Sequence, residues 1–269
     1  MTAMGNAGAP PDFVDVGGRR IRHRVVGGGD DAIVMVHGLC GSLDTWAGNQ
    51  DVLAAGGRRV AALDLPGHGA SSLDVGSGSL DELADAVLGY MDAAGIERAH
   101  MVGNSMGAAV CLALTDRAPQ RVRSLVLIGP AGIGQKIDSS VIRGLVGGRS
   151  REELEPLLGV LYADRTALTE AAVDQLVAYK QRPGVVDALT KIASSRYAGT
   201  PSGRQLRDVA GDVPTLMIWG SEDRMIPPPA PETVVRAGVE MRVLPGCGHM
   251  AHVEAADAVN RLIDEFLPR

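Results

Sequence analysis

Aromatic residues are scarce in this chain. Phenylalanine, tryptophan and tyrosine together make up 3% of its 269 residues. A site that stacks on a large aromatic molecule would have little to use beyond Trp46, Trp219 and the tyrosines. Hydrophobic residues nevertheless make up 45% of the chain, so most of them are aliphatic. This composition favours a small or medium-sized aliphatic guest.

The chain also lacks an excess of positive charge and any long apolar run. Its formal net charge is −6, which argues against a nucleic-acid-binding surface. No apolar run approaches the roughly 20 residues that span a bilayer. Residues 1–11 contain neither the basic nor the apolar part of a secretion signal. We therefore expect neither nucleic acid nor membrane as a partner.

Cysteine is rare as well. The three cysteines, Cys40, Cys111 and Cys247, are odd in number, lie far apart and lack the spacing of metal ligands. This usage predicts reduced thiols and a cytoplasmic location. The sequence shows no ligand set for a metal or for a redox cofactor, so we expect neither.

One basic cluster stands near the N-terminus. Residues 19–24 read Arg-Arg-Ile-Arg-His-Arg and follow the turn formed by Gly17 and Gly18. Charged and apolar residues alternate here with a period of two, as they do on a half-buried strand. We interpret the cluster as the solvent face of an antiparallel hairpin, in preference to a binding patch.

Beyond this hairpin, strand-like and helix-like segments alternate along the chain. Such a rhythm predicts an α/β fold with a mostly parallel, doubly wound sheet. A capping box at Ser79 to Glu82 predicts the start of a helix. The expected elements are the hairpin 13–26, strands 32–36, 60–63, 99–102, 122–128, 215–219 and 240–244, and helices 46–55, 79–94, 108–114 and 255–266.

The alternation stops between residues 134 and 210, where only amphipathic helical segments occur. A second capping box, Ser150 to Glu153, opens one of these segments, and Pro183-Gly184 separates two others. We predict that residues 1–133 and 211–269 form the core. Residues 134–210 are then a helical lid inserted between two strands of the sheet.

The strongest motif is Gly103-Asn104-Ser105-Met106-Gly107, which fits G-x-S-x-G. It lies between a strand-like run and an apolar helix-like run, the context of a nucleophile elbow. In that turn the serine adopts a strained backbone costing roughly 1–3 kcal/mol, and the two glycines avoid clashes with the flanking strand and helix. We therefore predict that Ser105 is a nucleophile.

A serine nucleophile needs a base, and the base needs an acid that orients it. Asp223 follows one predicted strand, and His249 follows the next, inside a glycine-rich loop. Loops at the carboxyl ends of parallel strands converge on one crevice, so we predict a triad of these residues with Ser105. The neighbouring Glu222 and His252 are interpreted as solvated side chains.

Acyl transfer also requires donors aimed at the developing oxyanion. The backbone amide of Met106, directly after the nucleophile, is one expected donor. The second is the amide of Leu39, in the loop after strand 32–36. We assign a structural role to His37, which leaves it outside the catalytic set. Cys40 has no base or acid placed to activate it as a nucleophile.

Over essentially its whole length the chain resembles the α/β-hydrolase superfamily. Besides the elbow, residues 64–71 (Asp-Leu-Pro-Gly-His-Gly-Ala-Ser) are similar to that superfamily's D-x-x-G-H-G-x-S turn. The resemblance implies the α/β-hydrolase fold. It also implies that this turn, His68 included, is a structural buttress with no catalytic part.

Two narrower resemblances follow. Segments 128–134, 179–185 and 248–250 are similar to the hydrolase-like region of acetoin dehydrogenase acyltransferase subunits. A lipoyl-domain sequence and the H-x-x-x-D-G acyltransferase motif are missing, so only the hydrolase fold carries over. Segment 104–107 resembles the meta-cleavage-product hydrolases, which cut C–C bonds. The chain departs from them in segment 39–42, which lacks their proline, and at Met250, where they carry an aromatic residue.

These observations predict a serine hydrolase that cleaves an ester, thioester or lactone of a small to medium aliphatic acyl substrate through an acyl-enzyme. Two alternatives stay open: a C–C bond hydrolase and a non-catalytic ligand receptor of the same fold. Oligomeric state is left open. Expected pocket residues are Asn104, Cys40, Met250 and Trp46. The lid charges that could meet a substrate carboxylate, if they face inward, are Lys136, Arg143 and Arg196.

Overall fold

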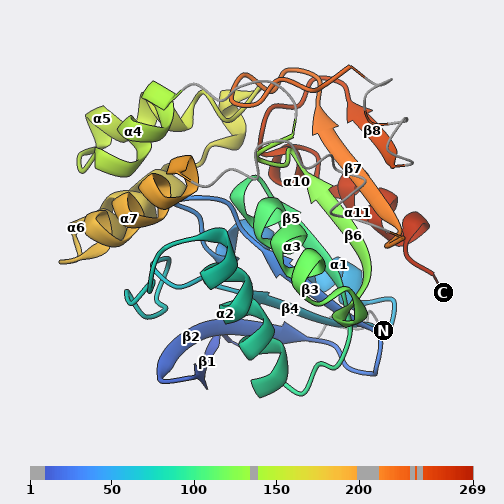
Figure 1. Cartoon of the computed structure of the whole chain (residues 1–269). Helices are drawn as coiled ribbons and strands as arrows, with labels where there is room; N and C mark the ends of the chain where they lie inside the picture. Colours follow the sequence, from blue (N-terminus) through green and yellow to red (C-terminus); the bar gives the residue numbers. More distant parts are fainter. Residues whose placement is uncertain (1–9, 134–138, 199–211, 231–233, 235–238, 269) are drawn as a thin grey trace, which may run out of the picture.

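A computed structural model describes residues 10–133, 139–198, 212–230, 234 and 239–268 of the chain (Figure 1). Its centre is an eight-stranded sheet with the order β1-β2-β4-β3-β5-β6-β7-β8. β1 and β2 form an antiparallel hairpin and β2 pairs antiparallel with β4, whereas all later pairs are parallel. The strands are β1 Asp12–Val16, β2 Arg19–Val26, β3 Ala32–Val36, β4 Arg59–Leu63, β5 Ala99–Asn104, β6 Val122–Ile128, β7 Thr215–Gly220 and β8 Glu240–Leu244.

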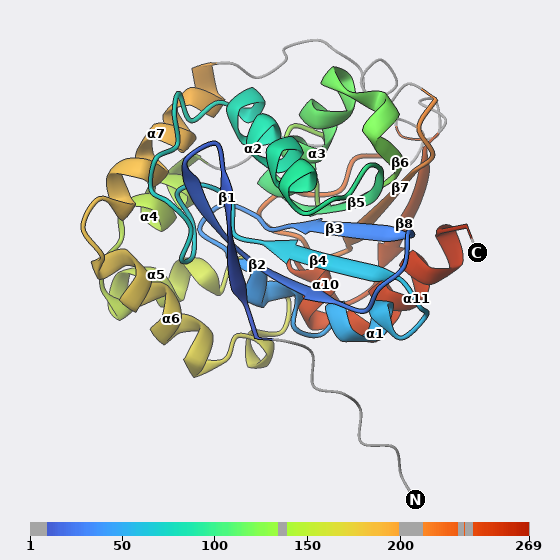
Figure 2. The same cartoon turned by 90° about the horizontal axis from the view of Figure 1, so that it is seen from below.

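Helices cover both faces of this sheet. Figure 2 shows α2 (Leu80–Ala93) and α3 (Met106–Arg117) on one face. The opposite face carries α1 (Gln50–Ala54), α10 (Ala251–Glu254) and α11 (Ala256–Phe266). The prediction of a mostly parallel, doubly wound sheet that starts with an antiparallel hairpin is confirmed.

β3 shows why the sheet needs two layers of helices. Successive side chains of a strand point to opposite faces. Val34 and Val36 pack into the core on the α2/α3 side, and Ile33 and Met35 pack into the second core beneath α1 and α11. All four side chains are fully buried, which explains the uninterrupted apolar run in the sequence.

Among the described residues, four α-helices follow β6 and precede β7, and we call them the inserted helices. They are α4 Ser139–Gly147, α5 Arg151–Leu158, α6 Glu170–Gln181 and α7 Val185–Ala198. Figure 1 shows them gathered at one end of the sheet, away from its faces. The predicted lid boundaries, 134 and 210, lie outside the described residues. None of the described helices is long and apolar enough to cross a membrane.

Local signals for helix starts were partly right. Ser150 and Glu153 form the predicted reciprocal capping box of α5. Ser79 accepts a bond from the Glu82 amide at the start of α2, but the Glu82 carboxylate pairs with Arg19 of β2. The predicted helix 46–55 is shorter in the structure: α1 covers Gln50–Ala54, and Trp46 is instead the last residue of the 3-10 helix η1 (Leu43–Trp46).

The arginines of β2 belong to the fold. Three of them form ion pairs with carboxylates of neighbouring loops and helices: Arg19 with Asp74 and Glu82, Arg22 with Asp44 and Asp64, and Arg24 with Asp51. The interpretation as the exposed face of a hairpin was therefore incomplete. These arginines do not face only water, because their ion pairs connect the hairpin to the neighbouring loops and helices.

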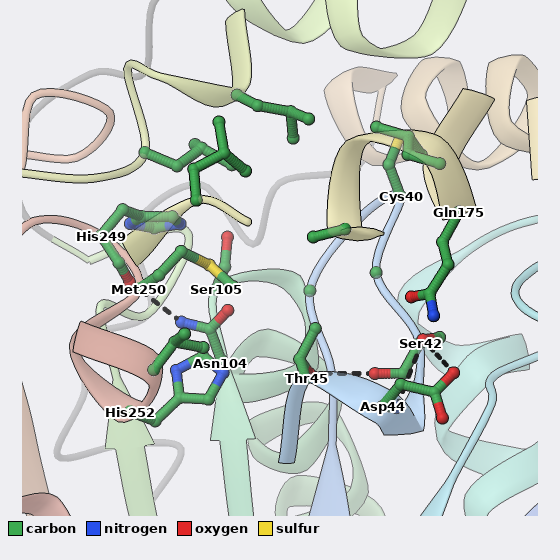
Figure 3. A pocket seen from close by; sticks show the side chains of 18 of the residues that line it. Cys40, Ser42, Asp44, Thr45, Asn104, Ser105, Gln175, His249, Met250 and His252 are labelled. Carbon is green, nitrogen blue, oxygen red and sulfur yellow. Dashed lines mark hydrogen bonds between the residues drawn. The ribbon is translucent and has the colours of Figure 1, made fainter. Parts of the chain in front are cut away.

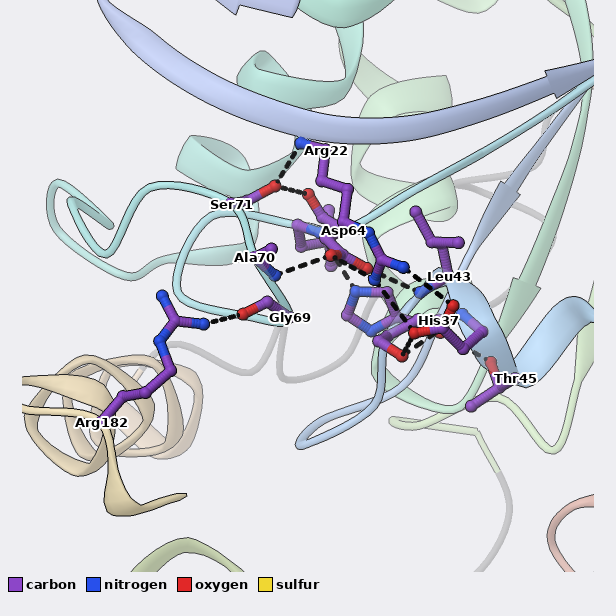
Figure 4. A network of polar contacts seen from close by, with 12 residues as sticks. Arg22, His37, Leu43, Thr45, Asp64, Gly69, Ala70, Ser71 and Arg182 are labelled. Atoms are coloured by element: carbon purple, nitrogen blue, oxygen red, sulfur yellow. Dashed lines mark hydrogen bonds and ion pairs between the residues drawn. The ribbon is translucent and has the colours of Figure 1, made fainter. Parts of the chain in front are cut away.

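The predicted buttress at residues 64–71 is built around the fully buried carboxylate of Asp64 (Figure 4). This carboxylate accepts the amide of Leu43 at 2.7 Å and the amide of Ala70 at 2.8 Å, and Arg22 donates to it at 3.3 Å. At Gly69, a Cβ atom would lie 2.0 Å from Asp64 Oδ2. One carboxylate thus joins β2, the start of η1 and the turn after β4.

We expect Asp64→Ala to lower the free energy of unfolding by about 2–5 kcal/mol, because it removes one of the two carboxylates that pair with Arg22 and leaves the amides of Leu43 and Ala70 without their acceptor. Urea unfolding followed by circular dichroism measures this loss. Asp44→Ala is the control, since the half-exposed Asp44 pairs with the same arginine and should cost less than about 1 kcal/mol. Equal losses in the two variants would contradict the assignment of the buttress to Asp64.

Candidate active site

Ser105 stands at the sharp turn between β5 and α3. Its backbone has φ 54° and ψ −115°, a left-handed conformation that non-glycine residues adopt at a cost of about 1–3 kcal/mol. The end of β6 holds the turn: the Ser105 amide donates to the Ile128 carbonyl at 2.9 Å, and the Ala131 amide donates to the Ser105 carbonyl at 3.1 Å. The elbow geometry expected from the motif is present.

The two glycines of the motif allow backbones to touch. A Cβ atom on Gly103 would lie 2.6 Å from the backbone of Ala108, and one on Gly107 would lie 2.1 Å from the Val36 carbonyl oxygen. Real Cβ atoms essentially never come so close. Any side chain at either position would push α3 away from the strands that place Ser105.

His249 and Asp223 meet on the loops that follow β8 and β7. His249 Nδ1 lies 2.8 Å from Asp223 Oδ2, and both side chains are buried. The other carboxylate oxygen of Asp223 accepts the amides of Met225 and Ile226 at 2.9 and 2.8 Å. The carboxylate therefore holds the imidazole with Nδ1–H as the donor, and this leaves Nε2 as the ring's basic nitrogen.

A second set of bonds fixes the loop that carries His249. The amides of His249 and Met250 both donate to the Leu161 carbonyl, at 2.8 and 3.2 Å. The carboxylate of Glu254 accepts the amide of Gly248 at 2.8 Å and, through its other oxygen, the amide of Ala163 at 2.8 Å. The stretch between α5 and α6 thus supports the histidine.

Asn104 joins the two sides of the site. Its Nδ2 donates to the Ile128 carbonyl at 3.2 Å and to the His249 carbonyl at 3.3 Å. It is buried, and it comes directly before Ser105 on β5. One amide group therefore contacts the end of β6 and the histidine loop together.

The loop after β3 lies against the elbow. A Cβ atom on Gly38 would be 3.2 Å from Ser105 Cβ, so the loop packs directly on Ser105. Among the described residues, the amides of Leu39 and Met106 have no hydrogen-bond acceptor. Two amides without acceptors beside a serine are the arrangement that an oxyanion would need.

Cys40, in the same loop, is not set up as a nucleophile. Burial raises the pKa of its thiol to about 11, and the thiolate is the reactive form. Its Sγ instead lies 3.7 Å from the Leu145 carbonyl of α4. The thiol thus contacts the inserted helices as a neutral group.

His37 and His68 form the base of this loop. His37 Nδ1 donates to the Gly38 carbonyl at 2.8 Å, and its Nε2 accepts the Leu65 amide at 3.1 Å. The His68 ring packs on it, with ring centroids 4.9 Å apart. Both nitrogens of His37 are thus used for structure, in agreement with the role that the sequence predicts.

A cavity of about 760 Å³ opens above Ser105 (Figure 3). Its wall is mostly aliphatic and comes largely from the inserted helices and the segments that connect them. Ser105, His249, Asn104, Cys40, Leu39 and Met250 all line it. The aliphatic residues of the wall are Leu39, Ala47, Ala70, Ile142, Leu145, Leu158, Leu161, Ala167, Leu168, Ala171, Ala172, Leu176, Met225, Val253 and Ala256.

Residues 31–256 match the family model described as the alpha/beta hydrolase fold. The chain belongs to the α/β-hydrolase family. It is 41% identical to a "dihydrolipoyllysine-residue acetyltransferase component of acetoin cleaving system" from Pseudomonas putida, over 97% of this chain and 70% of that protein. It is 34% identical to a "2-hydroxy-6-oxononadienedioate/2-hydroxy-6-oxononatrienedioate hydrolase" from Cupriavidus pinatubonensis, over 92% of this chain and 90% of that protein.

A solved structure with the same fold is the 2-hydroxy-6-oxo-6-phenylhexa-2,4-dienoate hydrolase from Rhodococcus sp. strain RHA1. It superposes with a TM-score of 0.83 at 26% identity and covers 96% of this chain and 98% of its own. Both resemblances found in the sequence, to acetoin-system subunits and to meta-cleavage-product hydrolases, are confirmed. The protein is an enzyme, a hydrolase of the α/β fold.

One aromatic residue of this α/β hydrolase does not lie where the sequence predicted. Trp46, expected in the substrate pocket, is fully buried between η1 and α10 and is not part of the cavity wall. Trp219 is also fully buried and donates from Nε1 to the Ile226 carbonyl. Neither indole can stack on a substrate. The aromatic residues of the wall are Tyr162 and Tyr179.

His252 is a further correction. The sequence interpretation placed it in solvent, but it is only 1% exposed and lines the cavity. The pattern could have shown this, because His252 follows His249 by three residues and precedes the apolar Val253 on a short helix. Glu222, by contrast, is exposed as predicted.

Of the three predicted lid charges, Arg143 is described, and it is not part of the cavity wall. Arg143 is exposed on α4 and donates to Ser139. Lys136 and the side chain of Arg196 lie outside the described residues. Among the described residues, no three His, Cys, Asp or Glu side chains cluster as metal ligands would.

The buried histidines should make the enzyme sensitive to acid. Burial, followed by the charge of His37, lowers the pKa of His68 to about 3, whereas an unfolded histidine titrates near 6.5. Between these two pH values the unfolded chain binds the additional proton. The stabilisation is therefore complete above about pH 6.5 and is lost as the pH falls towards 3, by up to about 1.4 kcal/mol per pH unit.

We expect His68→Gln, which cannot take up this proton, to flatten the dependence of unfolding free energy on pH between about 6 and 4. Urea unfolding at four pH values in this window measures the slope for the variant and for the wild type. Parallel slopes would show that His68 does not contribute to the acid sensitivity.

Proposed function

We propose that this protein is a serine hydrolase that cleaves an ester, thioester or lactone of a small to medium aliphatic acyl group through an acyl-enzyme on Ser105. The character of the cavity carries this proposal. Its charged side chains among the described residues are Arg22 and Asp44, and these two form an ion pair. An uncharged aliphatic acyl group suits such a wall, whereas a carboxylate would find no unpaired cation there.

The proposed chemistry follows from the positions of the polar groups. His249 Nε2 takes the proton of the Ser105 hydroxyl as the oxygen attacks the acyl carbonyl. Asp223 keeps Nδ1–H directed at itself and stabilises the imidazolium that forms. The amides of Leu39 and Met106 receive the oxyanion. His249 then gives its proton to the leaving group, and water activated by the same histidine releases the acid.

The direct test is Ser105→Ala. We expect the variant to lose at least about 10³-fold in kcat on p-nitrophenyl butyrate, because the covalent step disappears. A fluorophosphonate probe should label the wild type and not the variant. Ser194→Ala, at an exposed position of α7, is the matched control and should keep both activity and labelling. Wild-type rates in Ser105→Ala would refute the proposal.

C–C bond hydrolysis is the second candidate, and the relatives favour it. Several relatives 31–34% identical to this chain carry the name 2-hydroxy-6-oxononadienedioate hydrolase. Such a dioate has two carboxylates, and the described cavity wall has one paired cation for them. The same serine and histidine would serve either reaction, so only the substrate can decide between them.

We expect kcat/KM to be at least about tenfold higher on p-nitrophenyl butyrate than on a ring-fission dienoate, because an apolar wall leaves the carboxylates of the dienoate unpaired. Steady-state assays on the two substrates with one enzyme preparation measure the ratio. A preference for the dienoate would reverse our order of the two functions.

A further inference from the structure

The cavity above Ser105 has a buried side and an open side. On the buried side, Ile142, Leu145 and Met225 are at most 5% exposed. The exposed residues of the wall, which we call the open side, include Asp44, Ala47 and Gly48 in and after η1, and Thr169, Ala171 and Gln175 where α6 begins. An aliphatic acyl chain is removed from water best against the buried side. The other part of the substrate, its leaving group, then extends towards the open side.

Gln175 brings a free carboxamide to the open side. The residue is exposed and forms part of the wall, and its side chain makes no hydrogen bond with the described residues. Neighbouring hydroxyl groups are already used: Thr45 donates to the Ser42 carbonyl at 2.9 Å, and Thr169 accepts a backbone amide of α6 at 3.2 Å. The Gln175 carboxamide therefore offers both a donor and an acceptor to a ligand.

Asp44 lies opposite Gln175. Figure 3 shows the Gln175 side chain pointing from α6 towards Ser42 and Asp44 on the other wall. Asp44 Oδ2 accepts from Arg22 at 3.0 Å and from Ser42 at 3.1 Å, whereas Oδ1 accepts from Arg22 alone among the described residues, at 3.0 Å. A carboxylate oxygen can accept two hydrogen bonds, so Oδ1 has room for one more donor. The Asp44 side chain is 43% exposed, and a ligand can therefore reach it.

These two groups suit a neutral guest. The Asp44 carboxylate repels another carboxylate, and the Arg22 guanidinium beside it repels an ammonium group. A secondary amide is uncharged and carries its donor N–H and its acceptor C=O on opposite edges. Its N–H can donate to Asp44 while its oxygen accepts from Gln175 Nε2. One amide between the two walls thus pairs with both side chains.

We propose that the leaving group of the substrate carries a secondary amide, which Gln175 and Asp44 bind at the open side of the cavity. The inference rests on the proposed hydrolysis of an aliphatic acyl ester or thioester, and it adds the chemistry of the alcohol or thiol part. Both residues determine specificity in this assignment and take no part in the chemical step.

The test uses three thioesters of butyric acid whose leaving groups have equal length. S-Butyryl-N-acetylcysteamine carries the amide, S-(4-oxopentyl) thiobutyrate keeps the carbonyl but lacks the N–H, and S-pentyl thiobutyrate lacks both. Thiol release measures kcat/KM. We expect Gln175→Leu to lower the amide-to-alkyl ratio by about three- to tenfold, the range of one neutral hydrogen bond. Asp44→Ala should lower the amide-to-ketone ratio by at least about threefold, because the ketone has no N–H to lose.

Gln181→Leu is the matched control. Gln181 is an exposed glutamine of the same helix, outside the cavity wall, and its loss should leave both ratios unchanged. A second pair, p-nitrophenyl 4-acetamidobutyrate and p-nitrophenyl heptanoate, places the amide in the acyl part. The proposal is overturned if Gln175→Leu and Asp44→Ala leave the thioester ratios within about twofold of the wild type, if the rates fall equally on all thioesters, or if Gln175→Leu acts on the acyl pair instead.

Binding separates this inference from the proposed function. In the Ser105→Ala background, calorimetry compares the amide thioester with the ketone thioester, before and after Asp44→Ala, and the amide with the alkyl thioester, before and after Gln175→Leu. Loss of the binding preferences in these variants, without turnover of any ester or thioester by the wild type, would support the amide site and reject the proposed hydrolysis. Turnover with no effect of either substitution on binding or on the rate ratios would support the hydrolysis and reject the site.

Discussion

The contact between the first turn of α3 and the end of β3 is the constraint on which the site depends. Gly107 has no side chain, so the helix backbone lies directly against the Val36 carbonyl. Because β3 continues into the loop of Gly38 and Leu39, this contact also places that loop on Ser105. The strained turn at Ser105 persists because bonds from the end of β6 hold it from the other side.

The groups around the cavity carry little free charge. The Cys40 thiol is held neutral by burial, and so is the His252 imidazole. Arg22 and Asp44 neutralise one another. The Asp223 carboxylate is buried, and it accepts a hydrogen bond from His249. In such surroundings, charge that develops on a substrate interacts strongly with the few dipoles aimed at it.

The sequence predicted what depends on the order of elements along the chain. Strand, turn and helix around Ser105 were enough to expect the elbow. The rule that strand ends converge brought Asp223 and His249 together, as the 2.8 Å contact shows. The scarcity of aromatic residues correctly indicated an aliphatic cavity, because leucine and alanine are the most frequent residues in its wall.

What the sequence missed depends on contacts between distant segments. Trp46 and His252 are buried because η1 packs on α10, elements from opposite ends of the chain. The Glu82 carboxylate does not complete the capping box at the start of α2, because it pairs with Arg19 of β2. Glu254 belongs to no motif, and only the folded structure shows that it bonds both the histidine loop and Ala163.

The bonds around Leu161 have a consequence for how this enzyme can diversify. The inserted helices and the histidine loop share backbone hydrogen bonds and the Glu254 carboxylate. The segment between α5 and α6 therefore holds the loop of His249 in place, although by sequence it lies within the insertion. If the corresponding helices from another hydrolase are grafted here, the backbone carbonyl at the position of Leu161 must still accept the amides of His249 and Met250. Side-chain exchange on α4 and α6, which leaves this joint untouched, is the simpler route to a new substrate range.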